Sequence, residues 1–228
     1  MSAWSAWPGR YTDRHGAQEV VFESDGRALI RTTIRGVRFA GETMDALGAL
    51  AGEPPEAMFR FCDGDLCSCL LEWEQPLPVD VAGQGPRAGV LRCALRLGDP
   101  VPPPRGGLDG QSLTVTLRLD GRTYGGAEEH DDFEAALYDI QHRLPPGARL
   151  RACVACAWSD YSPAGHGLMA GLACFRRTKD RYRRVDGKHG PRGIFALWPA
   201  LTEFVQETHR CGEFEPRGTH GGYRGTFP

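Results

Sequence analysis

Hydrophobic and polar residues alternate over much of the first half of the chain. In residues 112–119, leucine or valine occupies every odd position, and serine, threonine or arginine occupies every even position. A period of two is typical of a strand with one buried and one exposed face. The alternation recurs over residues 90–98, and residues 27–39 and 57–79 have the composition of further strands. The first half is therefore predicted to be β-structure.

Turn-forming residues separate these strands. The Asp63-Gly64 step within the 57–79 segment has the composition of a hairpin turn. Connectors rich in glycine and proline occupy residues 82–89 and 98–110, which are expected to be surface loops. Several short strands at this spacing favour a sandwich or an open barrel.

One segment has helical periodicity instead. Its apolar residues between 133 and 144 recur at intervals that place them on one helical face. Asp131 and Glu134 can form a capping box at the start, and two prolines and a glycine over 145–147 end the helix.

The later part of the chain has weaker patterns. Residues 148–158 are expected to form a strand, residues 196–205 are expected to include a short helix, and the glycine-rich tail from 211 is expected to be irregular.

Composition narrows the class of protein. The chain has 228 residues, of which 41% are hydrophobic and 25% charged, as in a globular protein with room for a real core. The net charge of -2 argues against a surface built throughout for nucleic acid or anionic membrane. Nearly all of the positive charge is arginine, a bias typical of high-GC bacterial coding. No signal peptide and no membrane segment is expected, so the predicted location is cytoplasmic.

Eight cysteines in such a compartment favour metal binding or burial over disulfides. Cys153 and Cys156 form a Cys-x-x-Cys pair, which can bind one zinc ion from a tight turn. Cys174 and Cys211 can complete a tetrahedral shell, which would leave no position for water and make the site structural. These four residues are the predicted ligands of Zn²⁺.

Other interpretations of the cysteines stay open. His166, His209 or His220 could replace one cysteine ligand, or all four cysteines could be reduced and packed in ordinary surroundings. The remaining cysteines are Cys62, Cys67, Cys69 and Cys93, which are expected to pack in the core. The alternative is a second metal site formed by Cys62, Cys67 and Cys69.

The loop that follows the Cys-x-x-Cys pair is the candidate functional segment. Ordinary turn chemistry explains its serine, aspartate and proline residues. The functional interpretation is that Asp160, Tyr161 and His166 line a pocket held rigid by zinc, with Asp160 and His166 available for acid–base chemistry. Separately, residues 176–192 hold six arginines and both lysines, a run that is either a solvated face or a contact for nucleic acid.

Four segments together resemble an uncharacterised bacterial family known only as a domain of unknown function. They are the helix at 131–147, the Cys-x-x-Cys-x-x-Ser-Asp-Tyr-Ser-Pro motif, residues 203–217 and the Gly-Tyr-Arg-Gly tail. The resemblance is clearest from 133 to 225 and weaker over the β-rich half. It implies no catalytic residues, and it implies that the helix, the cysteine pair and the tail belong to one unit.

The expected architecture is a β-rich α+β protein with sandwich-like N-terminal sheets, one packed helix and a zinc-stapled C-terminal portion. The portions are 1–127 and 128–228, which could form one continuous domain. The expected function is a zinc-stabilised binding or accessory protein of immunity type, which presents the 159–167 loop to a protein partner or small molecule. The alternatives are an enzyme of small-molecule metabolism that uses this loop and, ranked last, nucleic-acid binding through 176–192.

Overall fold

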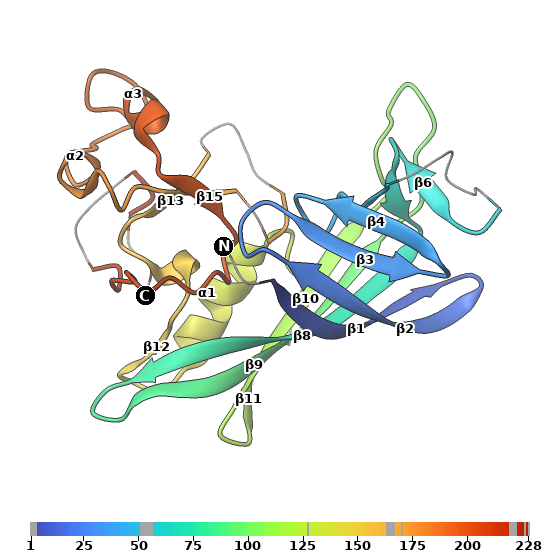
Figure 1. Ribbon diagram of the computed structural model, residues 1–228, viewed down its shortest axis with the longest axis horizontal. Helices are drawn as coiled ribbons and strands as arrows, with labels where there is room; N and C mark the ends of the chain where they lie inside the picture. Colours follow the sequence, from blue (N-terminus) through green and yellow to red (C-terminus); the bar gives the residue numbers. More distant parts are fainter. Residues whose placement is uncertain are drawn as a thin grey trace.

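A computed structural model describes residues 4–50, 57–126, 128–162, 167–169, 171–218, 223–225 and 227. Strands dominate this part of the chain, and both of its sheets pair antiparallel throughout (Figure 1). The β-rich α+β class is therefore confirmed. None of the described helices is long and apolar enough to cross a membrane.

The N-terminal portion forms one large sheet. Its strands are β1 (Ser5–Asp13), β2 (Gly16–Ser24), β3 (Ile30–Ile34), β4 (Val37–Gly41), β5 (Gly48–Ala49), β6 (Arg60–Cys62), β7 (Asp65–Cys67), β8 (Cys69–Val81), β9 (Gly85–Leu97), β10 (Gln111–Leu119) and β11 (Arg122–Gly125). Along the sheet their order is β11-β10-β9-β8-β1-β2-β3-β4-β5-β7-β6, and β12 (Ala148–Leu150) pairs with β8 off this path. The strands expected from alternation at 90–98 and 112–119 are confirmed as β9 and β10.

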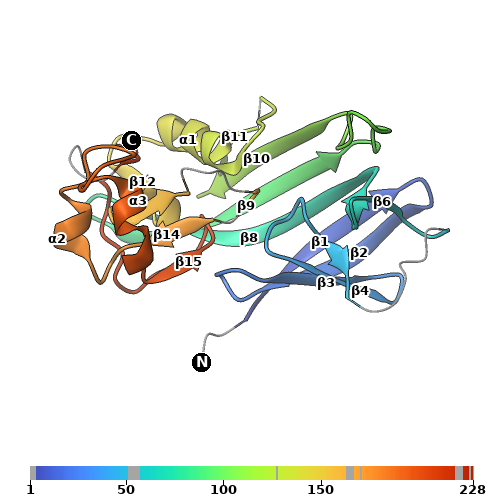
Figure 2. The same ribbon diagram turned by 90° about the horizontal axis from the view of Figure 1, so that it is seen from above.

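The sheet bends on itself to enclose the core. Strands β8–β10 and strands β1–β4 form two halves that meet at the β1–β8 pairing and give a sandwich-like shape (Figure 2). Phe22 and Trp73, from different halves, meet edge to face with ring centroids 6.3 Å apart. Buried side chains from both halves form one hydrophobic cluster. The alternation in the sequence places these side chains on a single face, and the bend brings the two faces together.

The Asp63-Gly64 turn is also confirmed, between β6 and β7. Asp63 has φ of 53° and Gly64 has φ of 95°, so both residues are in the left-handed region. A two-residue hairpin turn with this geometry favours Asp-Gly, since glycine has no Cβ and aspartate tolerates positive φ. The hairpin of β1 and β2 was not predicted, because its buried residues are interrupted by glycine and charged residues.

Helix α1 (Phe133–Arg143) lies on β10 and β11 as the helical periodicity predicts. Its capping residue differs from the prediction. Asp132, not Asp131, is the N-cap, and its Oδ1 accepts a hydrogen bond of 2.7 Å from the Ala135 N–H. Glu134 does not complete a capping box, because its carboxylate pairs with Arg224 from the tail.

The C-terminal portion is built from short elements. They are the 3₁₀ turns η1 (Cys153–Ala155) and η2 (Trp198–Ala200), the helices α2 (Lys179–Tyr182) and α3 (Ile194–Leu197), and the strands β13 (Ser159–Tyr161), β14 (Leu172–Cys174) and β15 (Glu203–Val205). The three strands form a second sheet in the order β13-β14-β15. The predicted strand over 148–158 was too long, since β12 ends at Leu150 and η1 follows. The short helix predicted within 196–205 is wrong for residues 203–205, which form β15.

The two portions share packing. Buried side chains of α1 and β12, together with Val154, belong to the same hydrophobic cluster as the N-terminal sheet. The second and third clusters lie within the C-terminal portion. The division at 127/128 stays a prediction.

Candidate functional site

The four cysteines predicted to bind zinc come from three places in the C-terminal portion. Cys153 begins η1 and Cys156 follows it, Cys174 ends β14, and Cys211 lies after β15. Backbone contacts fix this arrangement, because the Cys153 N–H donates to the His209 carbonyl at 3.0 Å. The fold therefore brings the distant tail cysteine to the Cys-x-x-Cys turn.

The other three cysteines act electrostatically on Cys153. Burial raises the pKa of the Cys153 thiol well above its usual value, and the charges of Cys156, Cys174 and Cys211 raise it further. Such mutual repulsion between thiolates is what a divalent cation would relieve, because metal binding deprotonates thiols outright.

Three of the sulfurs also accept hydrogen bonds. The Glu213 N–H donates to Cys211 Sγ at 3.3 Å, and Arg176 Nη1 donates to Cys174 Sγ at 3.3 Å. Burial raises the pKa of Cys156, while the backbone N–H groups of Glu215 and Trp158 act against that rise. Donors aimed at sulfur favour the thiolate form, so these residues fit the chemistry of a zinc ligand set.

Among the described residues, no group of three or more His, Cys, Asp or Glu side chains is arranged to hold one metal ion. Zinc binding would place each of the four sulfurs about 2.3 Å from the ion. The zinc site therefore stays a prediction.

The histidines considered as substitutes are placed only in part. The His209 ring lies against Gly26, where an added Cβ would be 2.6 Å from Nδ1. Burial, followed by the charge of Arg27, lowers the pKa of His209. His166 and His220 lie outside the described residues.

The loop residues Asp160 and Tyr161 point into the protein. Asp160 is 1% exposed, and its Oδ2 accepts hydrogen bonds from the Tyr182 hydroxyl at 2.9 Å and the Arg224 N–H at 3.1 Å. Burial raises the pKa of Asp160, against the opposing effects of Tyr182, Arg217 and Arg224. The carboxylate thus holds the tail against β13, and its predicted acid–base partner His166 is outside the described residues.

Tyr161 belongs to the same buried network. Its hydroxyl donates to Glu207 Oε1 at 3.2 Å, and the guanidinium of Arg224 lies 4.8 Å from its ring centroid. Burial raises the pKa of Tyr161 well above its usual value. Glu207 is also fully buried, burial raises its pKa to about 8, and its Oε2 finds no hydrogen-bond partner among the described residues.

Two arginines of this network were not singled out from the sequence. Arg217 donates from Nε to the Cys156 carbonyl at 3.1 Å and from Nη1 to the Gly225 carbonyl at 2.9 Å. Arg224 donates from Nη1 to the Val154 carbonyl at 2.6 Å and pairs with Glu134. Arg224 thus joins the helix, the cysteine turn and the tail. The Gly-Tyr-Arg-Gly motif was the available signal, but spacing alone does not reveal where an arginine binds.

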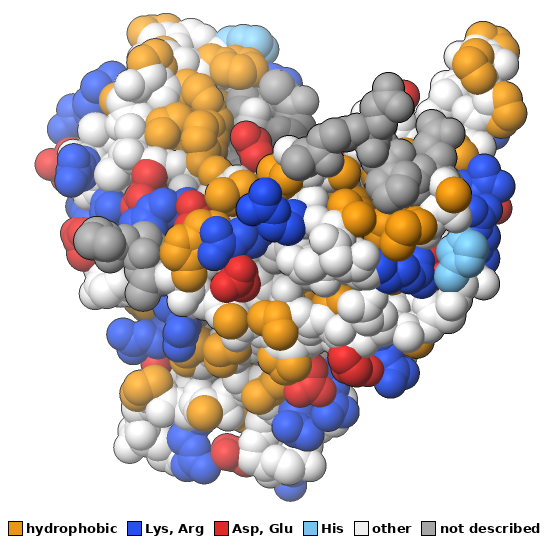
Figure 3. All heavy atoms as spheres, turned by 45° about the vertical axis from the view of Figure 1, so that its right-hand side comes forward, with side chains coloured by type: hydrophobic (Ala, Val, Ile, Leu, Met, Phe, Trp, Pro, Cys, Tyr) orange, Lys and Arg blue, Asp and Glu red, His pale blue; other side chains and the backbone are white. Residues whose placement is uncertain are grey.

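Four of the eight basic residues in the run at 176–192 form ion pairs with neighbouring acids. Its ion pairs are Arg176 with Glu203 and Glu213, Lys179 with Glu215, Arg183 with Asp180, and Arg192 with Asp186. Lys179 and Arg183 also lie 4.6 Å from the Trp158 ring centroid. On the face shown in Figure 3, basic side chains are interspersed with acidic and hydrophobic ones. The solvated-face and nucleic-acid interpretations of this run both stay predictions.

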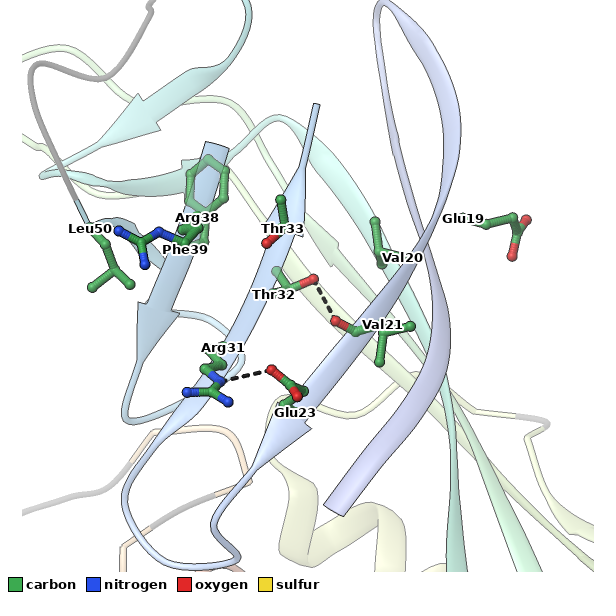
Figure 4. Close-up of a pocket in the computed structure, with 10 residues that line it drawn as sticks. All are labelled: Glu19, Val20, Val21, Glu23, Arg31, Thr32, Thr33, Arg38, Phe39 and Leu50. Carbon is green, nitrogen blue, oxygen red and sulfur yellow. Dashed lines mark hydrogen bonds and ion pairs between the residues drawn. The ribbon is translucent and has the colours of Figure 1, made fainter. Parts of the chain in front are cut away.

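A hollow of about 600 Å³ lies on the outer strands β2, β3 and β4 (Figure 4). Strands β2 and β3 pair only at Glu23–Arg31 and Ser24–Ile30, and beyond that point Thr32 Oγ1 donates to the Val21 carbonyl at 2.9 Å. The side chain of Val21 is half-exposed there. The splayed strands thus leave an accessible surface that is partly apolar.

The remaining cysteines occupy ordinary positions. Cys69 and Cys93 are buried in the main hydrophobic cluster, and burial raises the pKa of both. Cys67, two residues before Cys69, is also buried. Cys62 is half-buried, with its Sγ 3.4 Å from the Gly107 carbonyl oxygen.

The fold and these contacts define a β-rich α+β protein with a cysteine-bearing C-terminal portion. The chain belongs to a family of unknown function (DUF6304), whose model matches residues 5–159. The match covers the β-rich half, where the resemblance was expected to be weaker, and includes Cys153 and Cys156 but not Cys174 or Cys211. No curated protein and no solved structure matches the chain.

Proposed function

We propose that this protein is a non-enzymatic binding protein of accessory or immunity type in the cytoplasm. Its C-terminal portion would be fixed by Zn²⁺ bound to Cys153, Cys156, Cys174 and Cys211. Four thiolates would fill the zinc shell, so the ion would stabilise the fold and supply no reactive water. The partner would be a protein or a small molecule.

The geometry of Asp160 supports the binding role over the enzymatic alternative. A catalytic carboxylate must reach a reacting group. Asp160 is buried, and its Oδ2 already accepts hydrogen bonds from the Tyr182 hydroxyl and the Arg224 backbone N–H. Tyr161 is likewise committed to Glu207. The hollow on β2, β3 and β4 is lined by apolar, hydroxyl and charged side chains, which include the Arg31–Glu23 ion pair. A lining of this kind suits recognition.

Native mass spectrometry would test the zinc site. The expected result is one zinc ion per chain in the wild type and none in Cys211→Ser. Cys93→Ser is the matched control, because it removes a buried cysteine of the sheet core and should keep the ion. A wild-type chain without zinc, purified with zinc in the medium, would contradict the metal site.

Thermal unfolding of Asp160→Ala would test the role of the carboxylate. Loss of a buried acceptor with two donors is expected to destabilise the fold by roughly 2–4 kcal/mol. Unchanged stability would mean that Asp160 is available for chemistry, and would reopen the enzymatic alternative.

A further inference from the structure

A second hollow of about 270 Å³ lies where the two portions meet. It is bounded by the start of β1, the middle of β8 and the segment 206–210 that follows β15. Ser5, Trp7, Gln75, Pro76, Gln206 and His209 are among the residues that line it. None of the cysteines predicted to bind zinc lines this hollow.

The hollow exists because β1 and β8 separate. They pair from Gly9–Trp73 to Thr12–Leu70, and the next strand on that side of β8 is β12, which pairs only with Val79–Val81. The segment 206–210 closes the space between these pairings. It is held by the Gln206 N–H, which donates to the Gly26 carbonyl at 3.2 Å, and by the His209 carbonyl, which accepts from Cys153.

Gln75 brings an unpartnered acceptor to this hollow. The residue is 2% exposed on the core-facing side of β8, between Trp73 and Leu77. Its Nε2 lies 3.5 Å from Met169 Sδ, which can only accept, so the nitrogen end of the amide faces the sulfur. Its Oε1 has no hydrogen-bond partner among the described residues.

Gln206 brings an unpartnered donor. It is 1% exposed, and its Oε1 accepts a hydrogen bond of 2.8 Å from Ser24 Oγ. Ser24 Oγ also accepts a hydrogen bond of 2.9 Å from the Gly26 N–H. Gln206 Nε2 has no acceptor within the described part of the chain.

A third buried glutamine shows what a structural role requires. Gln141 donates from Nε2 to the Ala148 carbonyl at 3.0 Å and accepts on Oε1 from the Leu150 N–H at 2.9 Å. Both ends of its amide are satisfied, as in most buried polar side chains. Gln75 and Gln206 each leave one end unsatisfied, an arrangement that costs stability unless a bound group completes it.

We propose that this hollow binds a small molecule or peptide unit by recognising the N–H and the carbonyl of a secondary amide in the ligand. The ligand N–H would donate to Gln75 Oε1, and the ligand carbonyl would accept from Gln206 Nε2. Trp7 and Pro76 supply apolar contacts, and the volume limits the recognised group to a lactam, a nucleobase-like ring or one peptide unit. This assignment rests on the binding role proposed above and names its ligand class, but it does not require the metal.

Titration of the full-length, zinc-supplied protein would test the site. The probes are 2-piperidone, which has a cis amide, and N-methylacetamide, which has a trans amide. Their controls are N-methyl-2-piperidone and N,N-dimethylacetamide, which lack the N–H donor. Binding is followed by NMR through the side-chain NH₂ signals of Gln75 and Gln206 and the indole N–H of Trp7. Saturable shifts are expected with at least one N–H amide, and at least tenfold weaker binding with its methylated control.

Isosteric variants assign the binding to the two glutamines. Gln75→Met and Gln206→Met should each weaken binding at least tenfold, whereas Gln141→Met should leave it unchanged. Gln75→Met should also unfold at a temperature no lower than wild type, whereas Gln141→Met should unfold at a lower one, because it leaves two backbone groups unpaired.

Each outcome decides between the alternatives. Preference for piperidone would indicate a cyclic small molecule, and preference for methylacetamide a peptide unit. Equal binding of the methylated controls, no binding of either amide, or a loss of stability in Gln75→Met as large as in Gln141→Met would overturn the amide site. Zinc content is measured on the same sample, so a missing metal and a missing amide site are separate failures.

Discussion

Glu207 is a buried carboxyl whose surroundings oppose its ionisation. It is fully buried, and it shares its Oε1 with Tyr161 while Oε2 stays without a described partner. Burial raises its pKa from 4.5 to about 8. The carboxyl is therefore protonated at neutral pH in the folded protein and ionised in the unfolded chain.

Replacing Glu207 with Gln is expected to stabilise the protein at neutral and mildly alkaline pH. Between pH 4.5 and 8 the folded state holds one more proton than the unfolded state, so stability falls as the pH rises through this range. Glu207→Gln should remove that fall and raise the free energy of unfolding at pH 8 by roughly 2 kcal/mol.

Urea unfolding from pH 5 to 9 measures the effect. Glu19→Gln serves as the control, because Glu19 is exposed on β2 and should change stability by less than about 0.5 kcal/mol. A wild-type pH profile in Glu207→Gln would contradict the buried neutral carboxyl.

At the scale of elements, the start of α1 shows how a one-residue difference changes the capping contact. Asp131 and Asp132 are both suitable capping residues by composition, but Asp132 alone supplies the described side-chain bond to Ala135. Asp132→Ala is expected to destabilise the protein by about 1 kcal/mol, and Asp131→Ala by much less. Thermal unfolding of the two variants distinguishes them, and equal losses would contradict the cap assignment.

One ion pair also links the β1–β2 hairpin to the β3–β4 hairpin. Arg35, in the turn between β3 and β4, donates from both Nη atoms to Asp13 at the end of β1, at 2.7 and 2.6 Å. Burial acts to raise the pKa of Asp13, but hydrogen bonds from Arg35, the His15 N–H and Tyr11 outweigh it and lower the pKa to about 2.

The Arg35–Asp13 ion pair should make the stability of the protein depend on pH in the acid range. The pKa of Asp13 in the folded protein lies below its ordinary value of 3.8. The ion pair therefore contributes fully to the free energy of unfolding above pH 3.8, and this contribution disappears as the pH falls to about 2. Asp13→Asn should cost about 1–2 kcal/mol at pH 7 and almost nothing at pH 2. Chemical unfolding at both pH values measures this, and an equal cost at each would contradict the ionic origin.

At the scale of the whole molecule, the two portions should respond differently to metal removal. The large sheet has long paired strands and the main hydrophobic cluster, whereas the C-terminal strands are three residues long and pack on smaller clusters. A chelator is expected to increase amide hydrogen exchange at 153–156 and 206–211 and to leave β8–β10 unchanged. Exchange that is uniform along the chain, or unchanged everywhere, would contradict a zinc-held C-terminal portion.

The periodic elements could be predicted from sequence because their signals are local. Alternation in β9 and β10, helical spacing in α1 and the Asp63-Gly64 turn each depend on neighbouring residues, so the pattern is contained in a short window. The β13–β15 sheet could not be found this way, since a three-residue strand has too little alternation to distinguish it from a loop.

The candidate site was predictable in its cysteines and not in its contacts. Cys153 and Cys156 are recognised by spacing, and the fold brings Cys174 and Cys211 into electrostatic range of them. The inward orientation of Asp160, by contrast, depends on Tyr182 and Arg224, which lie 22 and 64 residues away. A local sequence pattern does not predict which side chains of a loop a distant segment will bury.

The sequence by itself determined that this is a β-rich protein with one packed helix and a Cys-x-x-Cys turn, because hydrophobic periodicity and ligand spacing are properties of adjacent residues. Only the tertiary structure decided that Asp160 and Tyr161 are buried, that part of the basic run is paired with acids, and that Gln75 and Gln206 line one hollow. These features depend on contacts between distant segments. Burial then sets their chemistry, because a polar group without water must find its partner in the fold or in a ligand.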